Sequence, residues 1–140
     1  MSAIVLGFDR SPGAESALRT AIDVAQRYGA PLVLVHGIAP PGAVGEEAGQ
    51  ARAALDDLVE RMTAPAVSAA EAAGVEVLVE VVDDKPAQAL VAAADRHDAA
   101  VIVVGTWKDS PLRGALLGSV AHKLLQISTR PVLCVPGTEE

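Results

Sequence analysis

The sequence predicts a doubly wound, Rossmann-like α/β fold, in which a five-stranded parallel sheet carries helices on both faces. Short aliphatic runs alternate with segments of helical periodicity along the whole chain. These runs are nearly continuous in apolar residues, as in strands buried on both faces. The apolar share of 51% comes with only one Phe, one Trp and one Tyr, which is typical of alanine-rich helices on a β-branched sheet. At 140 residues the chain has the length of one domain, and we expect a single domain over 1–140.

The first strand and helix are bounded by clear local signals. A strand is expected over 3–9, where almost every residue is apolar. Ser11 followed by Pro12 predicts a helix start, because serine caps a first turn and proline is tolerated there. Apolar residues then recur at helical spacing until Gly29, which predicts the end of the helix. The second strand is expected over 32–36.

The middle of the chain carries a loop, a long helix and a third strand. Proline and glycine are frequent over 39–49, which predicts a loop. A helix is expected over 50–73, and Pro65 should kink or divide it. The third strand is expected over 75–82, and its two glutamates indicate a sheet edge.

The last third of the chain completes the alternation. In order, we expect a helix from Pro86, a strand over 99–104, a helix over 119–127 and a strand over 131–135. Strands that alternate with helices predict a parallel sheet with right-handed crossovers. Ligands of such sheets bind beyond the carboxyl ends of the strands, at the point where the strand order reverses. Asp9 and Gly105 both follow strands, so we expect them to face one cleft.

The segment from Gly105 to Ser119 has the features of an anion site. Glycine lets the backbone approach a ligand, and the next helix offers free N–H groups and a positive dipole end. An ordinary loop in which Ser119 only caps the helix is the alternative. The net charge of −7 and the few aromatic residues argue against a nucleic-acid partner. A small anion remains compatible with this charge.

Other residue types exclude several classes of function. Cys134 is the only cysteine, so no disulfide framework or thiolate metal site is expected. No apolar run reaches the ~20 residues of a membrane span, and no targeting segment is seen, so we expect a cytoplasmic protein. His36, His97 and His122 lack metal spacing and are interpreted as structural or exposed. No nucleophile and base pair is found, and no enzyme is predicted.

The chain resembles the universal stress protein family over essentially its whole length, and three stretches carry the resemblance. They are the opening over 5–12, the segment over 104–120 and the closing stretch over 130–136. The family pattern is glycine, two residues, glycine, nine residues, then glycine with serine or threonine. Gly105 and Gly118 with Ser119 match it, and Lys108 stands in place of the middle glycine. The resemblance implies a homodimer through the last strand and binding of ATP, with or without Mg²⁺.

The resemblance also implies roles for individual residues. Asp9 and Gly37 would contact the adenosine part, and Gly105, Gly118, Ser119 and Val120 would hold phosphates and ribose. Lys108 and Arg113 would lend positive charge. Two interpretations of Lys108 stay open, because its side chain either fills the space of a triphosphate or neutralises it. Asp83 and Asp84 precede Pro86 where many relatives have glycine, and would repel phosphates unless Lys85, Lys108 or a divalent cation compensates.

We therefore expect a dimeric stress-response protein that binds ATP reversibly and signals through its bound and free states. Slow ATP hydrolysis is left open if Mg²⁺ binds near Asp83 or Asp84. The alternative is a nucleotide-free, dimeric protein-interaction module of the same fold. In that alternative Lys108 and Trp107 close the cleft, and an unknown protein is the partner. An enzyme of the same fold class, such as a flavin or adenylyl-transfer domain, is a third option.

Overall fold

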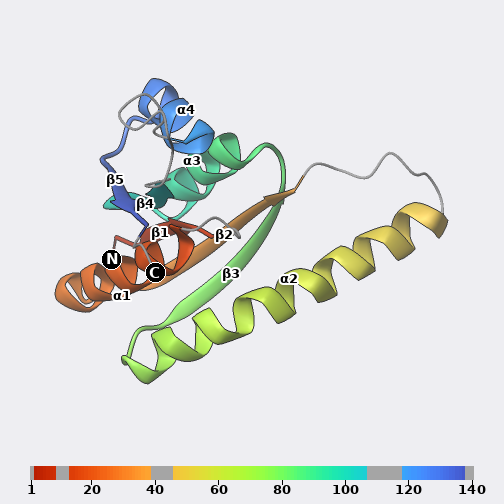
Figure 1. The fold of residues 1–140 in the computed structure, drawn as a ribbon, viewed down its shortest axis with the longest axis horizontal. Helices are drawn as coiled ribbons and strands as arrows, with labels where there is room; N and C mark the ends of the chain where they lie inside the picture. Colours follow the sequence, from red (N-terminus) through yellow and green to blue (C-terminus); the bar gives the residue numbers. More distant parts are fainter. Residues whose placement is uncertain (1, 9–12, 39–45, 107–117, 138–140) are drawn as a thin grey trace.

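The computed structural model describes residues 2–8, 13–38, 46–106 and 118–137. Strands and helices alternate through these residues (Figure 1). In chain order they are β1 (Ile4–Gly7), α1 (Ala14–Tyr28), β2 (Leu32–Ile38), α2 (Glu46–Ala72), β3 (Val77–Asp83), α3 (Pro86–Arg96), β4 (Val101–Thr106), α4 (Ser119–Ile127) and β5 (Val132–Pro136).

The five strands form one parallel sheet in the order β3-β2-β1-β4-β5. The chain runs outward from β1 to β3 and then returns to the other side of β1 to form β4. The strand order therefore reverses between β1 and β4, which makes this the switch point of the sheet. The predicted five-stranded parallel sheet is confirmed, and so is the prediction that the third strand lies at an edge.

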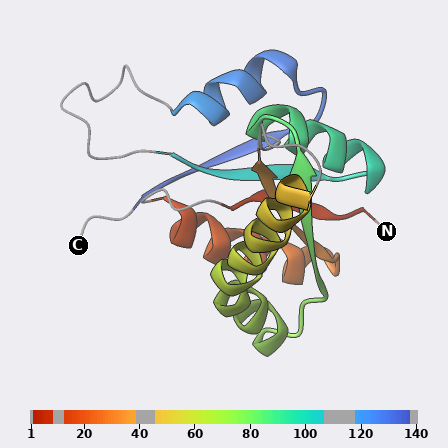
Figure 2. The ribbon, with the colours of Figure 1, turned by 90° about the vertical axis from the view of Figure 1, so that its right-hand side faces the viewer.

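Helices cover both faces of the sheet, as predicted (Figure 2). Alternate residues of each strand point to opposite faces, so every inner strand contributes to two cores. One core joins Ile4, Leu6, Leu32 and Leu34 to alanines of α1 and α2. The other joins Val5, Val33 and Val35 to α3 and α4, mainly through Ala89, Leu90, Ala93 and Leu124. Small alanine side chains let the helices lie close to the bulky strands, which accounts for the composition of the chain.

Several predictions of helix and strand bounds differ from the structure. The helix α2 begins at Glu46, so the predicted loop over 39–49 and the predicted helix start at 50 are wrong for residues 46–49, and the strand bounds differ by one to two residues. The first helix begins at Ala14 with Gly13 as its N-cap, so the predicted start at Ser11 and Pro12 is wrong. The long helix α2 is one continuous element that contains Pro65, so Pro65 does not divide it. Pro65 is exposed, and the carbonyl group that loses its helical hydrogen bond there can bond to water instead. Figure 1 shows the amino-terminal part of α2 extending beyond the sheet.

Candidate functional site

A cleft opens at the carboxyl edge of the sheet, at the switch point. It is lined by the ends of β1, β2 and β4 and by the first residues of α3 and α4. Its empty space is about 430 Å³, counting the part open to solvent. Among the described residues its walls are mostly apolar, from residues such as Val35, Leu90 and Val104, and His36 borders it at the end of β2.

Gly105 lies at this cleft and also touches the start of α1. A Cβ atom added at Gly105 would lie 2.6 Å from the carbonyl carbon and oxygen of Gly13. A Cβ added at Gly13 would in turn lie 2.7 Å from the carbonyl oxygen of Thr106. Real Cβ atoms essentially never come so close to backbone, so both glycines are required by this contact. Packing of α1 on β4 is therefore a reason for glycine at 105 that is independent of any ligand.

The N-terminus of α4 borders the same cleft. Gly118 is its N-cap, with φ of 99° and ψ of 141°, a conformation that side chains rarely adopt. Ser119 is the first helical residue and is exposed, so the alternative that Ser119 caps the helix is wrong. Val120 lines the cleft. Among the described residues, the N-cap Gly118 makes no side-chain cap hydrogen bond and the first turn of α4 has no acidic residue. The N–H groups of such a turn can bind an anion.

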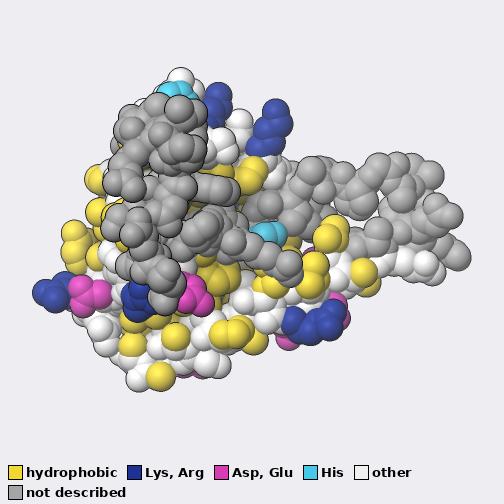
Figure 3. Space-filling model, in the orientation of Figure 1, with side chains coloured by type: hydrophobic (Ala, Val, Ile, Leu, Met, Phe, Trp, Pro, Cys, Tyr) yellow, Lys and Arg dark blue, Asp and Glu magenta, His cyan; other side chains and the backbone are white. Residues whose placement is uncertain are grey.

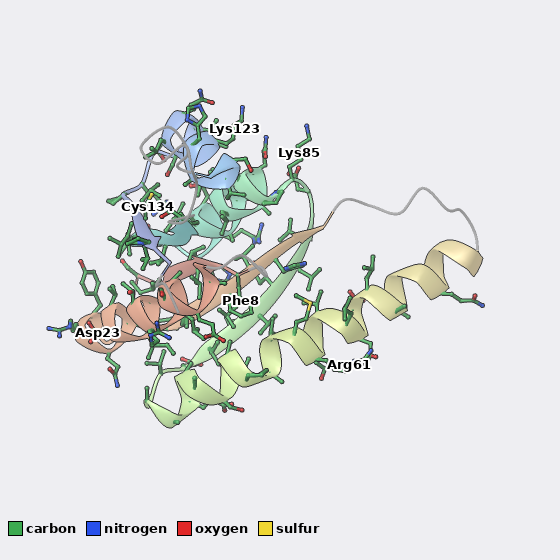
Figure 4. The ribbon with its side chains drawn as sticks, viewed as in Figure 1. Phe8, Asp23, Arg61, Lys85, Lys123 and Cys134 are labelled. Carbon is green, nitrogen blue, oxygen red and sulfur yellow. The ribbon has the colours of Figure 1, made fainter. Side chains whose placement is uncertain are left out.

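The start of α3 adds positive charge next to α4. Lys85 is the N-cap of α3, and Pro86 follows at the first helical position. Lys85 and Lys123 line a hollow between the starts of the two helices, together with Ser119 (Figure 4). Figure 3 shows basic side chains at the upper edge of the molecule, over α3 and α4. This edge of the cleft is suited to a negatively charged group.

Asp84 does not line the cleft or the hollow beside it. Its side chain is exposed, and its Oδ1 accepts a hydrogen bond of 2.8 Å from the backbone N–H of Lys85. The repulsion of phosphates expected from this carboxylate is thereby reduced, because it faces the turn before α3. The side chain of Asp83 lies outside the described residues.

His36 was interpreted as structural or exposed, and the structure places it at the border of the cleft. It lies in β2, is half-buried, and its Nδ1 is 3.1 Å from the carbonyl oxygen of Phe8. The signal for its position was available, since His36 ends the predicted second strand and so falls at the ligand-binding edge. Gly37 follows it and pairs with Val82 of β3.

Asp9, Lys108 and Arg113 lie outside the described residues, as does Trp107. Their roles stay predictions. Of the other expected site residues, Gly105 and Val120 line the cleft, while Gly118 and Ser119 form the adjoining start of α4. Over the described ranges, no group of three or more His, Cys, Asp or Glu could hold a metal ion. Within the same ranges, no helix has the length and apolar character of a membrane span.

Two titratable groups outside the cleft have shifted pKa values. Burial by itself would raise the pKa of Glu80, but hydrogen bonds from His97 and Arg96 to its carboxylate outweigh this and lower it. Burial raises the pKa of the Cys134 thiol, which is half-buried in β5. A thiol with a raised pKa carries little thiolate at neutral pH, in line with an inert residue.

The fold and the cleft define the class: a doubly wound α/β domain with a cleft at its switch point. The model of the Universal stress protein family matches residues 1–136. The chain belongs to the universal stress protein family, as its resemblance to that family predicted.

Relatives and solved structures agree with this assignment. Stress response protein NhaX of Bacillus subtilis is 28% identical, and the alignment covers 94% of this chain and 96% of the relative. A universal stress protein from Archaeoglobus fulgidus, solved in complex with dAMP, has a TM-score of 0.71 at 28% identity and covers 96% of this chain and 98% of its own. Another, solved in complex with cAMP, has a TM-score of 0.75 at 27% identity and covers 98% of both chains.

Proposed function

We propose that the chain is a cytoplasmic stress-response protein that reversibly binds an adenine nucleotide, ATP, and acts as a dimeric regulatory module. The observation that carries the proposal is the cleft at the switch point, which ends at the N-terminus of α4, where the N-cap is Gly118. Phosphate groups are bound well by such helix starts. The dAMP and cAMP complexes of two related proteins favour an adenine base.

Each part of the nucleotide has a proposed place. Gly118, Ser119 and Val120 would hold the phosphates and ribose at the start of α4, with Gly105 beside them. Asp9 and Gly37 would contact the adenosine part, and Lys108 and Arg113 would supply positive charge. Lys85 and Lys123 line the hollow next to Ser119 and would add to that charge.

A Mg²⁺ ion would enter with the phosphates rather than occupy a site of its own. The oxygen ligands it prefers would be supplied by the phosphates. Asp84 lies outside the described lining of the cleft and of the hollow beside it, and it accepts a hydrogen bond from the backbone N–H of Lys85. We assign no reaction to the protein and propose that binding itself is the regulatory event.

The dimer is proposed to form through β5. This strand pairs with β4 on one side, and among the described residues no strand pairs with its other side. Leu133 on this edge strand is 37% exposed. Pairing with β5 of a second copy would satisfy the free backbone groups and cover the apolar edge. Sedimentation should give a dimer for the natural chain and a shift toward monomer for Leu133→Lys. An unshifted sedimentation coefficient in that variant would place the interface elsewhere.

Calorimetric titration tests nucleotide binding directly. ATP, ADP, AMP and cyclic AMP are titrated with and without Mg²⁺, and mass spectrometry identifies anything that copurifies. Ser119→Glu should weaken ATP binding by at least about tenfold, because it places a carboxylate beside the proposed phosphate site. Glutamate suits the first turn of a helix, so the fold should not suffer. Gln126→Glu, exposed near the other end of α4, is the matched control and should bind as the natural chain does.

Lys108→Gly separates the two interpretations of that residue. A large gain in ATP affinity would mean that the lysine obstructs the site, and a loss would mean that its charge contributes to binding. Silence of the natural chain in every titration would exclude the nucleotide and favour the protein-interaction module instead.

A further inference from the structure

The strand β3 has a free edge, and the register of the sheet shows which backbone groups lie along it. The N–H of Leu32 donates to the carbonyl oxygen of Glu76, and Leu32 pairs with Val77. In a parallel ladder the N–H and C=O of one residue point to the same side, and successive residues alternate, so the even-numbered residues of β3 bond to β2. The odd-numbered residues direct both groups away from the sheet, and they are Val77, Val79 and Val81.

The outward backbone groups of β3 have no hydrogen-bond partner among the described residues. The strand is seven residues long, and apolar side chains are exposed on both of its faces. Leu78 is 48% exposed on the face that α3 covers, and Val79 is 39% exposed on the face that α2 covers. A long apolar edge of this kind is a template for an added strand. The dimer proposed above uses β5 and leaves this edge open.

The charge along β3 indicates what kind of chain fits its edge. The segment 76–84 contains four acidic residues and no basic one. The carboxylate of Glu80 is paired with basic side chains at the end of α3. Glu76 and Asp84, at the two ends of the strand, are exposed and have no ion pair among the described residues. Two copies paired through β3 would bring like charges together, which destabilises a pair of strands. A strand with a basic residue at each end would complement the edge instead.

We propose that the free edge of β3 binds an extended segment of a partner protein, with basic residues at both ends and apolar residues between them. The segment continues the sheet, and its backbone bonds to the outward groups of β3. Its apolar side chains pack beside Leu78 on one face and Val79 on the other, and its basic residues meet Glu76 and Asp84. No residue of β3 lines the cleft, so binding at this edge and nucleotide binding can be tested separately.

Two synthetic peptides and amide hydrogen exchange test the proposal. Both peptides are as long as the segment 76–84 and alternate Val with Thr, and one has Lys at each end where the other has Glu. By fluorescence anisotropy the Lys peptide should bind about tenfold more tightly, because each cross-strand charge pair changes sign between the two. In the free chain the amide protons of Val77, Val79 and Val81 should exchange fast, and those of the even-numbered residues slowly. The Lys peptide should protect the fast ones.

Two pairs of variants separate the backbone from the charge. Val79→Pro removes one outward N–H, which proline allows on an edge strand, and should weaken binding of the Lys peptide by about tenfold. Val79→Thr keeps the N–H and should bind as the natural chain does. Glu76→Lys should reduce the preference for the Lys peptide by about threefold. Glu15→Lys makes the same change of charge at an exposed position of α1, away from β3, and should keep the preference.

Other outcomes would overturn the proposal. Failure of the Lys peptide to bind, or equal binding of both peptides, would exclude a basic strand as the occupant. Binding without protection of the outward amides would place the peptide elsewhere on the molecule. Protection that is already present in the free chain would show that the edge is covered, by a second copy if it depends on protein concentration and by the same chain if it does not. If Val79→Pro does not fold, Glu76→Lys and the exchange data decide alone.

Discussion

Replacing Gly105 with alanine tests whether this glycine is required by packing or by a ligand. The new Cβ would lie 2.6 Å from two backbone atoms of Gly13 and 3.0 Å from its Cα. Ordinary contact begins at 3.4 Å, so the end of β4 and the start of α1 would have to separate by about 0.8 Å. No rotamer change relieves this overlap, because both partners are backbone. Overpacking of this kind costs roughly 1–3 kcal/mol.

The assay is urea and thermal unfolding without nucleotide, where only packing contributes. A loss of this size should lower Tm by about 4 °C per kcal/mol for a chain of this length. Gly49→Ala is the matched control, since a Cβ there meets nothing within 4 Å. Because Gly49 lies inside α2, this control should stabilise the chain by about 0.5–1 kcal/mol.

The reciprocal substitution makes the test stricter. Gly13→Ala should destabilise to a similar extent, because its Cβ would lie 2.7 Å from the carbonyl oxygen of Thr106. The double variant should lose less than the sum of the two, since one separation of the backbones relieves both overlaps. Unchanged unfolding of Gly105→Ala, combined with a loss of nucleotide affinity, would refute the packing argument.

Three further predictions concern stability away from the cleft. Glu80→Gln should lower the free energy of unfolding by about 1 kcal/mol at neutral pH. Folding lowers the pKa of Glu80, so this difference should be constant above the pKa of the unfolded chain and should disappear as the pH falls through the pKa of the folded chain. Urea unfolding at a series of pH values measures it. Arg130→Lys should cost about 1–2 kcal/mol in urea unfolding, because a lysine cannot reproduce the guanidinium bonds of Arg130 to the carbonyl oxygen of Ala99 and the carboxylate of Asp98. Pro65→Ala should raise the urea midpoint by the equivalent of about 1–2 kcal/mol, since it restores an N–H inside a continuous helix.

The order of elements could be predicted because their signals are local. Runs such as 32–35 are apolar throughout, and Gly29 follows the last residue of α1 as predicted. The start of α1 could not be predicted in this way. Ser11 and Pro12 form a good local start signal, but the helix begins at Ala14 because Gly13 fits against β4. That contact joins residues almost a hundred positions apart, and local propensity contains no information about it.

The site was predictable in outline and not in its polar detail. The edge and the switch point follow from the alternation of strands and helices alone, and Gly105 and Val120 do line the cleft there. The orientation of the His36 ring, for example, depends on a hydrogen bond to the carbonyl oxygen of Phe8, which follows β1. The tautomer of a histidine is set by such a partner, and no spacing along the sequence reveals it.

The two glycines that match the family pattern are weaker evidence for a ligand than the match alone suggests. Gly105 is required by contact with Gly13, and Gly118 by its positive φ at the start of α4. Both glycines would be needed in a chain of this fold that bound nothing. The case for a nucleotide therefore depends on features that packing does not require, namely the start of α4, where no side-chain cap is seen among the described residues, and the two lysines beside it. For the same reason, of the three glycine positions in the family pattern (105, 108 and 118), we expect a substitution at 108 to report most directly on ligand binding.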